Sequence, residues 1–179
     1  IAEAKKRFPF VEKIKFEDDA FFLLNREEIT DFSNQYKEKI NLPLIILGAT
    51  PSTLNKEKFT LLVEAGLWEI RMGIQTAGEA SKKLFKRPHS NKRVFHATNI
   101  VHRFKNKVRA KYDVILDSPW ETNQDQIETL DFLSRIKTPW ILNLFSLTFY
   151  PGTDLDTKAK AEGIVTDDLN QVYRKNFSG

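Results

Sequence analysis

The sequence predicts an α/β fold in which a parallel sheet is built from about five βα units, the arrangement of a partial TIM-type barrel. Three observations support this prediction. Segments with a strand pattern alternate with helical segments of about 10–15 residues, as in right-handed βαβ crossovers. Several expected strands are continuous apolar runs, which suits a sheet covered on both faces or a barrel wall. The expected strands also end in small, polar or acidic residues.

Five segments carry the strand pattern, and they span residues 13–17, 44–47, 68–76, 108–116 and 140–150. Helices are expected in the intervals between them. Asn25 and Glu28 form a capping box at the start of the first of these helices. Asn55 can cap the second, and Gly66 suits the position just after its last turn.

The remaining helices have recognisable starts and ends. Three side chains are expected to cap them: Ser90, Thr122 and Thr153. Breaks or ends are expected at Pro88, Pro139 and Gly163. We therefore predict one domain, residues 1–165. The tail, residues 166–179, is expected to be irregular and polar and to lead to a following region, with Tyr173 and Phe177 packing it onto the body.

Composition excludes several classes of protein. The 179 residues are 41% hydrophobic and carry a formal net charge of +4, which is ordinary for a globular domain. The chain has no cysteine, so disulfides, thiolate metal sites and cysteine nucleophiles are excluded within it. No apolar run approaches the roughly 20 residues of a membrane span. We expect a cytoplasmic protein without a membrane partner, and the mild charge does not by itself indicate nucleic acid.

Acidic residues gather where the expected strands end. Asp18 and Asp19 follow the first strand, and Asp117 and Glu121 follow the fourth. In parallel α/β proteins, ligands bind at the carboxyl ends of the strands. Each residue also has a structural interpretation, because Asp is common in turns and Glu121 suits the first turn of a helix. The pattern predicts a ligand-binding rim and leaves the role of Glu121 open.

Basic residues and histidines give weaker signals. Residues 82–93 carry six Lys or Arg, a pattern that favours a solvated surface over a nucleic-acid contact because only Phe85 interrupts it as an aromatic. His96 and His102 are six residues apart on one expected helix, so they do not share a face. They lack the i, i+4 spacing of a helical zinc pair. No metal site is predicted from the histidines.

Five motifs in a fixed order carry a resemblance to a known family. They read "IKFEDDAFF", "AGLWEIRMGIQT", "KRPHSNKRV", "YDVILDSPWET" and "SLTFYPGTDL". Together they resemble the radical S-adenosylmethionine (SAM) enzyme superfamily over almost the whole chain. The cobalamin-associated group, which includes proteins like the oxidative cyclase of Mg-protoporphyrin IX monomethyl ester, is the most similar. The resemblance implies a partial (β/α)6 barrel that binds SAM.

The resemblance also implies roles for residues at the first and third strand ends. In the family, the segment after the second barrel strand meets the amino group of SAM. Here that segment corresponds to Glu17, Asp18 and Asp19. The end of the family's fourth strand lies near the ribose and carboxylate of SAM. Here that end corresponds to Arg71, Gln75 and Thr76.

The last two strand ends are implied to face the adenine. The family's fifth strand carries a motif like Gly-x-Ile-x-Gly, which becomes Asp113-x-Ile115-x-Asp117 in this chain. Both glycines are replaced, and Ile115 keeps the apolar position. The sixth strand's end, near Phe149 and Tyr150, would approach the adenine through its backbone.

The iron–sulfur motif of the family is missing. Its Cys-x3-Cys-x2-Cys sequence binds a [4Fe–4S] cluster and requires thiolates, and this chain has none. Residues 1–8 match the family's first helix, so we expect the first strand and the cluster loop to lie upstream. The five strands would then be the second to sixth of the barrel. The chain is expected to be part of a longer enzyme and inactive alone, with the cluster in the parent protein and cobalamin in a separate domain.

The truncation has a further consequence. Without the first barrel strand, the strand at residues 13–17 would expose an unpaired edge. We expect this edge to self-associate or to be covered by the N-terminal helix.

The substrate and the reaction stay open. Within the family, oxidative cyclisation, methylation and related C–H chemistry are alternatives, as are activities like those of tRNA methylthiotransferase and coproporphyrinogen oxidase. Outside it, a non-redox (β/α)-barrel enzyme would use oxygen ligands suited to Mg²⁺ or acid/base groups, namely Asp18, Asp19, Asp117 and Glu121. A non-catalytic nucleic-acid-binding module would use residues 82–93.

Overall fold

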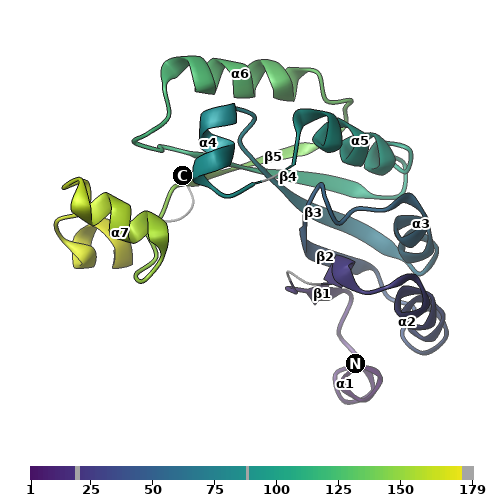
Figure 1. Cartoon of the computed structure of the whole chain (residues 1–179). Coiled ribbons are helices and arrows are strands. Elements are labelled where there is room, and N and C mark those ends of the chain that lie inside the picture. Colours follow the sequence, from purple (N-terminus) through teal and green to yellow (C-terminus); the bar gives the residue numbers. More distant parts are fainter. Residues whose placement is uncertain (19–20, 88, 175–179) are drawn as a thin grey trace.

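The computed structural model describes residues 1–18, 21–87 and 89–174, and it contains one five-stranded parallel sheet (Figure 1). Neighbouring strands follow the chain order β1-β2-β3-β4-β5. Their bounds are β1 Ile14–Phe16, β2 Leu44–Ala49, β3 Leu67–Gln75, β4 Arg109–Leu116 and β5 Ile141–Ser146. The prediction of about five parallel βα units is confirmed. The fifth strand is shorter than expected, because the chain leaves the sheet after Ser146.

Helices connect the strands. They are α1 Ala2–Arg7, α2 Arg26–Lys39, α3 Lys56–Glu64, α4 Glu79–Leu84, α5 Asn91–His102, α6 Asn123–Ser134 and α7 Asp154–Ala161. A 3₁₀ turn, η1 (Phe21–Leu23), and a π-helical turn, η2 (Leu169–Tyr173), complete the elements. The expected caps are present. Asn25 forms its capping box with Glu28, Thr122 forms one with Asp125, and the other three cap side chains accept hydrogen bonds from backbone amides. Pro88, where a helix break was expected, lies outside the described residues.

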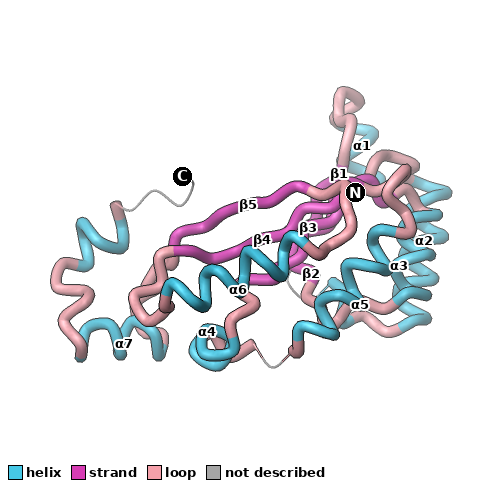
Figure 2. Tube along the Cα trace, turned by 90° about the horizontal axis from the view of Figure 1, so that it is seen from above, coloured by secondary structure: helices cyan, strands magenta, loops and turns pink. Residues whose placement is uncertain are grey.

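The two faces of the sheet differ in what covers them. Helices α2 to α6 lie on one face, and among the described residues no helix covers the other (Figure 2). On β4, Tyr112 and Val114 point to the helices and are buried, whereas Lys111 and Asp113 alternate with them and are half-buried. We call the uncovered face the open face. It is the face that lines the interior when such a sheet curls into a barrel.

The main core lies between the sheet and the helices. Its largest fully buried side chains include Tyr112, Phe59, Ile70 and Met72. Burial raises the pKa of the Tyr112 hydroxyl, so this residue stays neutral in the core. None of the helices in the described parts of the chain is both long and apolar enough to cross a membrane.

A second, smaller hydrophobic cluster lies beyond the carboxyl ends of β4 and β5. Leu147, Phe149, Ala159, Val165 and Val172 form it. It gathers α7 and η2 into a lobe at one end of the sheet (Figure 1). The tail therefore contains a helical turn where irregular structure was expected, and buried Val172 attaches it while Tyr173 is exposed. Phe177 lies outside the described residues.

The β1 edge is open in the described structure. Ile14, Lys15 and Phe16 pair with β2 on one side, and no described strand pairs with the other side. Helix α1 lies near the start of β1 (Figures 1 and 2). Self-association through this edge stays a prediction.

Candidate functional site

A cavity of about 590 Å³ opens where the first four strands end. We call it the carboxyl-edge cavity. Its lining comes from β1 to β4 and from the segment after α4, and comprises Glu17, Leu47, Gly48, Ala49, Thr50, Arg71, Gly73, Gln75, Arg87 and Asp113. Three residues predicted from the sequence, Glu17, Arg71 and Gln75, are thereby brought together. Parallel strands meet at one edge, so residues from distant parts of the chain share this cavity.

An ion pair between neighbouring strands forms the floor of this cavity. The Arg71 Nε donates to both carboxylate oxygens of Asp113, at 2.8 and 2.7 Å. The Asn143 Nδ2 donates to the same carboxylate at 2.9 Å. The Arg71 guanidinium also lies 4.8 Å from the centre of the Phe145 ring. These contacts hold Asp113 in one orientation, and the pair is electrically neutral as a unit.

Glu17 supplies the negative charge at the mouth of the cavity. It forms an ion pair with Lys15, two residues earlier on the same side of the strand. The hydrogen bond and charge of Lys15 lower the pKa of Glu17, which is therefore ionised at neutral pH. Asp18 follows it at the end of β1, and Asp19 lies outside the described residues.

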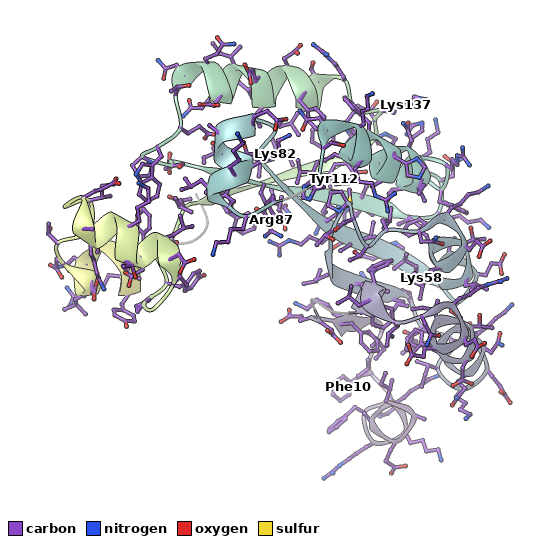
Figure 3. All side chains as sticks on the ribbon, viewed as in Figure 1. Phe10, Lys58, Lys82, Arg87, Tyr112 and Lys137 are labelled. Carbon is purple, nitrogen blue, oxygen red and sulfur yellow. The ribbon has the colours of Figure 1, made fainter. Side chains whose placement is uncertain are left out.

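Arg87 is a charged lining residue that was not among the site residues predicted from the sequence. Its Nε is buried and has no hydrogen-bond partner among the described residues. Figure 3 shows it near the carboxyl ends of the strands, on the segment that follows α4. Among the described residues, Asp113 is already paired with Arg71 and Glu17 with Lys15, so Arg87 has no ion-pair partner in the cavity. The sequence did not single out Arg87 because it lies in a basic run, and such runs usually form solvated surfaces.

Two strand ends adopt left-handed backbone at this edge. Gln75 has φ of 69° and Asp117 has φ of 60°. The pairing of β3 with β4 shifts register between Gly73 and Gln75, and a Cβ added at Gly73 would lie 2.5 Å from the Gln75 side-chain nitrogen. The absence of a side chain at Gly73 therefore makes room for the Gln75 amide in the cavity. Left-handed backbone favours glycine, which is the residue that the family motif carries in place of Asp117.

Glu121 and Thr76 belong to a buried polar network behind the cavity. The Glu121 Oε1 accepts hydrogen bonds from the hydroxyls of Thr76, at 3.1 Å, and Ser81, at 2.9 Å. The Thr129 hydroxyl lies 3.3 Å from that of Thr76 and accepts from the backbone N–H of Ala77 at 3.1 Å. Thr76 is fully buried. The network ties the turn after β3 to α4 and α6, and this structural role answers the question left open for Glu121.

The other predicted site residues lie beside the second cluster. Ile115 packs against it, and the Phe149 ring lies 5.7 Å from that of Trp120. Tyr150 is exposed. Asp117 accepts a hydrogen bond from the Ser146 hydroxyl at 2.8 Å. The structure thus places these residues at the ends of β4 and β5, outside the lining of the carboxyl-edge cavity.

The basic segment serves structural purposes in part. The Lys82 side chain is 4% exposed and bonds to Glu79 and Asn91. Arg93 donates to backbone carbonyls of the turn after β2, those of Pro51, Ser52 and Leu54. Within the part of the chain that the structure describes, no group of three acidic, histidine or cysteine residues is arranged to hold a metal ion. Neither the nucleic-acid nor the metal hypothesis gains support from these residues.

Comparison with solved structures identifies the class of fold. No protein-family model matches the chain, and no curated protein matches its sequence. The architecture is nevertheless that of radical SAM barrels, as the following solved structures show. Escherichia coli coproporphyrinogen III oxidase, described as a radical SAM enzyme, has a TM-score of 0.68 at 18% identity, over 93% of this chain and 38% of that one.

Two further structures agree. The radical SAM methyltransferase TsrM from Kitasatospora setae, solved with cobalamin and a [4Fe–4S] cluster, has a TM-score of 0.69 at 14% identity, over 90% of this chain and 32% of that one. Elp3 from Methanocaldococcus infernus has a TM-score of 0.64 at 16% identity, over 90% of this chain and 43% of that one. These similarities establish the fold. The chain spans between 32% and 43% of the length of these structures.

Proposed function

We propose that this chain forms the SAM-binding part of the barrel of a radical SAM enzyme. One observation carries the proposal: the carboxyl-edge cavity, on a fold shared with radical SAM enzymes, combines a carboxylate, an amide and an unmatched guanidinium. SAM is a zwitterion with an added sulfonium charge, so it offers an ammonium, a carboxylate and ribose hydroxyls. The cavity presents a complementary group for each of these.

The lining residues suggest how SAM would be held. Glu17 would accept from the ammonium group, and Arg87 would pair with the carboxylate, since charge-assisted hydrogen bonds are the strongest that side chains offer. Gln75 and Asp113 would bond the ribose hydroxyls. Asp113 suits this task because Arg71 and Asn143 hold its carboxylate in place, leaving lone pairs free. A cavity of about 590 Å³ falls in the ordinary range for cofactor sites.

The [4Fe–4S] cluster would come from outside this sequence, because the chain has no cysteine to bind it. When bound, the reduced cluster and SAM together supply a 5′-deoxyadenosyl radical that abstracts hydrogen from a substrate. This polypeptide would contribute binding, orientation and electrostatics. The chain alone is expected to be inactive. We further propose that the parent enzyme belongs to the cobalamin-associated group, with oxidative cyclisation or methylation as its chemistry and cobalamin held in a separate domain.

Isothermal titration of the chain with SAM tests the binding proposal. We expect measurable, weak binding, because the cluster that would chelate SAM is absent. Arg87→Gln should weaken that binding at least about tenfold through loss of a charge-assisted pair. Lys83→Gln is the matched control, since it removes the same charge from an exposed position on the neighbouring helix. Undetectable binding, or equal affinities in the two variants, would contradict the proposal.

A further inference from the structure

A second cavity, of about 340 Å³, lies at the opposite end of the sheet, where β3, β4 and β5 begin. We call it the amino-edge cavity. Its lining includes Trp68, Lys105, Lys107, Arg109, Pro139 and Trp140. In Figure 3, Lys137 marks the turn that leads into β5, far from Arg87 at the carboxyl edge. This cavity shares no lining residue with the carboxyl-edge cavity.

The charged residues that line this cavity are all cations. Three cations line it, and the residues that line it include no carboxylate. Lys105 and Lys107 are both exposed, and neither forms an ion pair within the described part of the chain. Arg109 lies 3.9 Å from Glu69, but the same carboxylate accepts a closer contact from Lys111 at 2.9 Å. Most of this positive charge therefore has no ion-pair partner among the residues that the structure describes.

Helix capping does not account for these lysines. Basic side chains in the last turn of a helix stabilise its negative end. Helix α5, however, ends at His102, so Lys105 and Lys107 lie beyond its last turn. Their backbone amides bond to the carbonyls of His102, at 3.1 Å, and Phe104, at 2.8 Å. This hydrogen-bonded turn holds both lysines at the rim of the cavity.

The walls of the cavity are apolar and fixed. The Trp68 ring contacts two cations, with the Lys13 Nζ 4.2 Å and the Arg109 Cζ 5.6 Å from its centre. The Trp140 ring lies 5.6 Å from that of Tyr112, and its Nε1 donates to the Ile136 carbonyl at 3.3 Å. Ligand sites in proteins are commonly such preformed apolar cavities with a few well-placed polar groups.

We propose that the amino-edge cavity binds a small phosphorylated ligand with a flat apolar body, of the nucleoside monophosphate class. The phosphate, with about two negative charges at neutral pH, would lie at the rim among Lys105, Lys107 and Arg109. The apolar body would lie between the two indole side chains. A cavity of about 340 Å³ fits one such unit rather than a chain of them. The proposal stands apart from SAM binding at the other edge.

Tryptophan fluorescence gives a direct test. The chain has three tryptophans, and Trp120 lies by the second cluster, far from this cavity. A Trp120→Phe background leaves Trp68 and Trp140, both in the lining, as the only reporters. Titration with adenosine 5′-monophosphate should change the fluorescence, while adenosine and inorganic phosphate should each need at least tenfold higher concentrations. SAM, which lacks a phosphate, should not compete.

Paired variants complete the test. In the same background, Lys105→Gln with Lys107→Gln should weaken nucleotide binding at least tenfold. Lys37→Gln with Lys39→Gln, two exposed lysines of α2, is the control and should leave it unchanged. No fluorescence change with millimolar nucleotide would overturn the proposal. So would equal affinity in both double variants, or steeply salt-dependent binding of an oligonucleotide without binding of the mononucleotide.

Discussion

The helices place charged residues of opposite sign at the two edges of this sheet. Helix amino ends meet the carboxyl edge and favour acids, as Glu79 and Asp125 show in the first turns of α4 and α6. Helix carboxyl ends meet the amino edge and favour bases, as Lys37 and Lys39 show in α2. Residues that depart from this default are informative. Arg87 is a cation at the acidic edge, and two tryptophans, Trp68 and Trp140, line the same cavity as the lysines at the basic edge.

The largest expected effect breaks the network behind the carboxyl edge. Glu121→Ala removes the acceptor of two buried hydroxyls, those of Thr76 and Ser81. We expect the free energy of unfolding to fall by about 2–3 kcal/mol, as for lost hydrogen bonds to a charged group. Urea denaturation measures it. Glu128→Ala, an exposed carboxylate on α6, is the control and should change stability by less than about 0.5 kcal/mol.

A smaller effect tests the left-handed backbone at Asp117. Asp117→Val places a β-branched residue at φ of 60°, and we expect a loss of about 1–2 kcal/mol in urea denaturation. Asp117→Gly relieves the backbone but loses the bond from Ser146, so its stability should stay within about 1 kcal/mol of the parent chain. Equal losses in the two variants would show that side-chain contacts, rather than backbone conformation, decide this position.

A change at Gly73 separates binding from stability. The added Cβ of Gly73→Ala would meet the far end of the Gln75 side chain, which is flexible and can move away. Stability should therefore change by less than about 1 kcal/mol. SAM affinity should fall several-fold, because the Gln75 amide is displaced from the position in the cavity where it would bond the ribose. Titration calorimetry and urea denaturation on the same samples distinguish the two, and an unchanged affinity would remove Gln75 from the proposed site.

The smallest expected effect is a pH dependence centred on His89. Burial, followed by the charges of Arg87 and Lys82, lowers the pKa of this imidazole below the ordinary histidine value of about 6.5. The unfolded chain therefore takes up a proton first, and stability should decline as the pH falls below about 6.5 and through the depressed folded-state pKa. His89→Gln should show a shallower decline between pH 7.5 and 5 in urea denaturation. An identical slope would assign the pH dependence to other groups.

The sequence predicted the strands and caps well because both depend on local pattern. The capping pair Thr122 and Asp125, and the apolar alternation of β4, need no knowledge of distant contacts. The cavity was predicted only in part. Glu17 and Gln75 lie directly at strand ends. Arg87 instead reaches the cavity through the packing of α4, which depends on contacts with α6, a helix far away in sequence.

Glu121 is a position whose role the local sequence could not decide. Its place after a strand and before a helix left open whether it is a ligand-facing acid or a residue that stabilises the helix terminus. Only the folded arrangement brings Thr76 and Ser81, more than 35 positions earlier in the chain, to its carboxylate. The end of β5 at Ser146 could not be predicted either. The residues that follow, through Phe149, stay apolar, and this pattern suits the second cluster as well as it suits a strand.

The most direct test of the central claim is a titration of isotopically labelled chain with SAM, followed by amide chemical shifts in two-dimensional NMR. We predict that the amides of Glu17, Thr50, Gln75 and Arg87 shift together with one saturation curve, while those of Lys105, Lys107 and Arg109 stay in place. An absence of shifts at the carboxyl edge, or shifts confined to the amino edge, would contradict the assignment of the carboxyl-edge cavity as the SAM site.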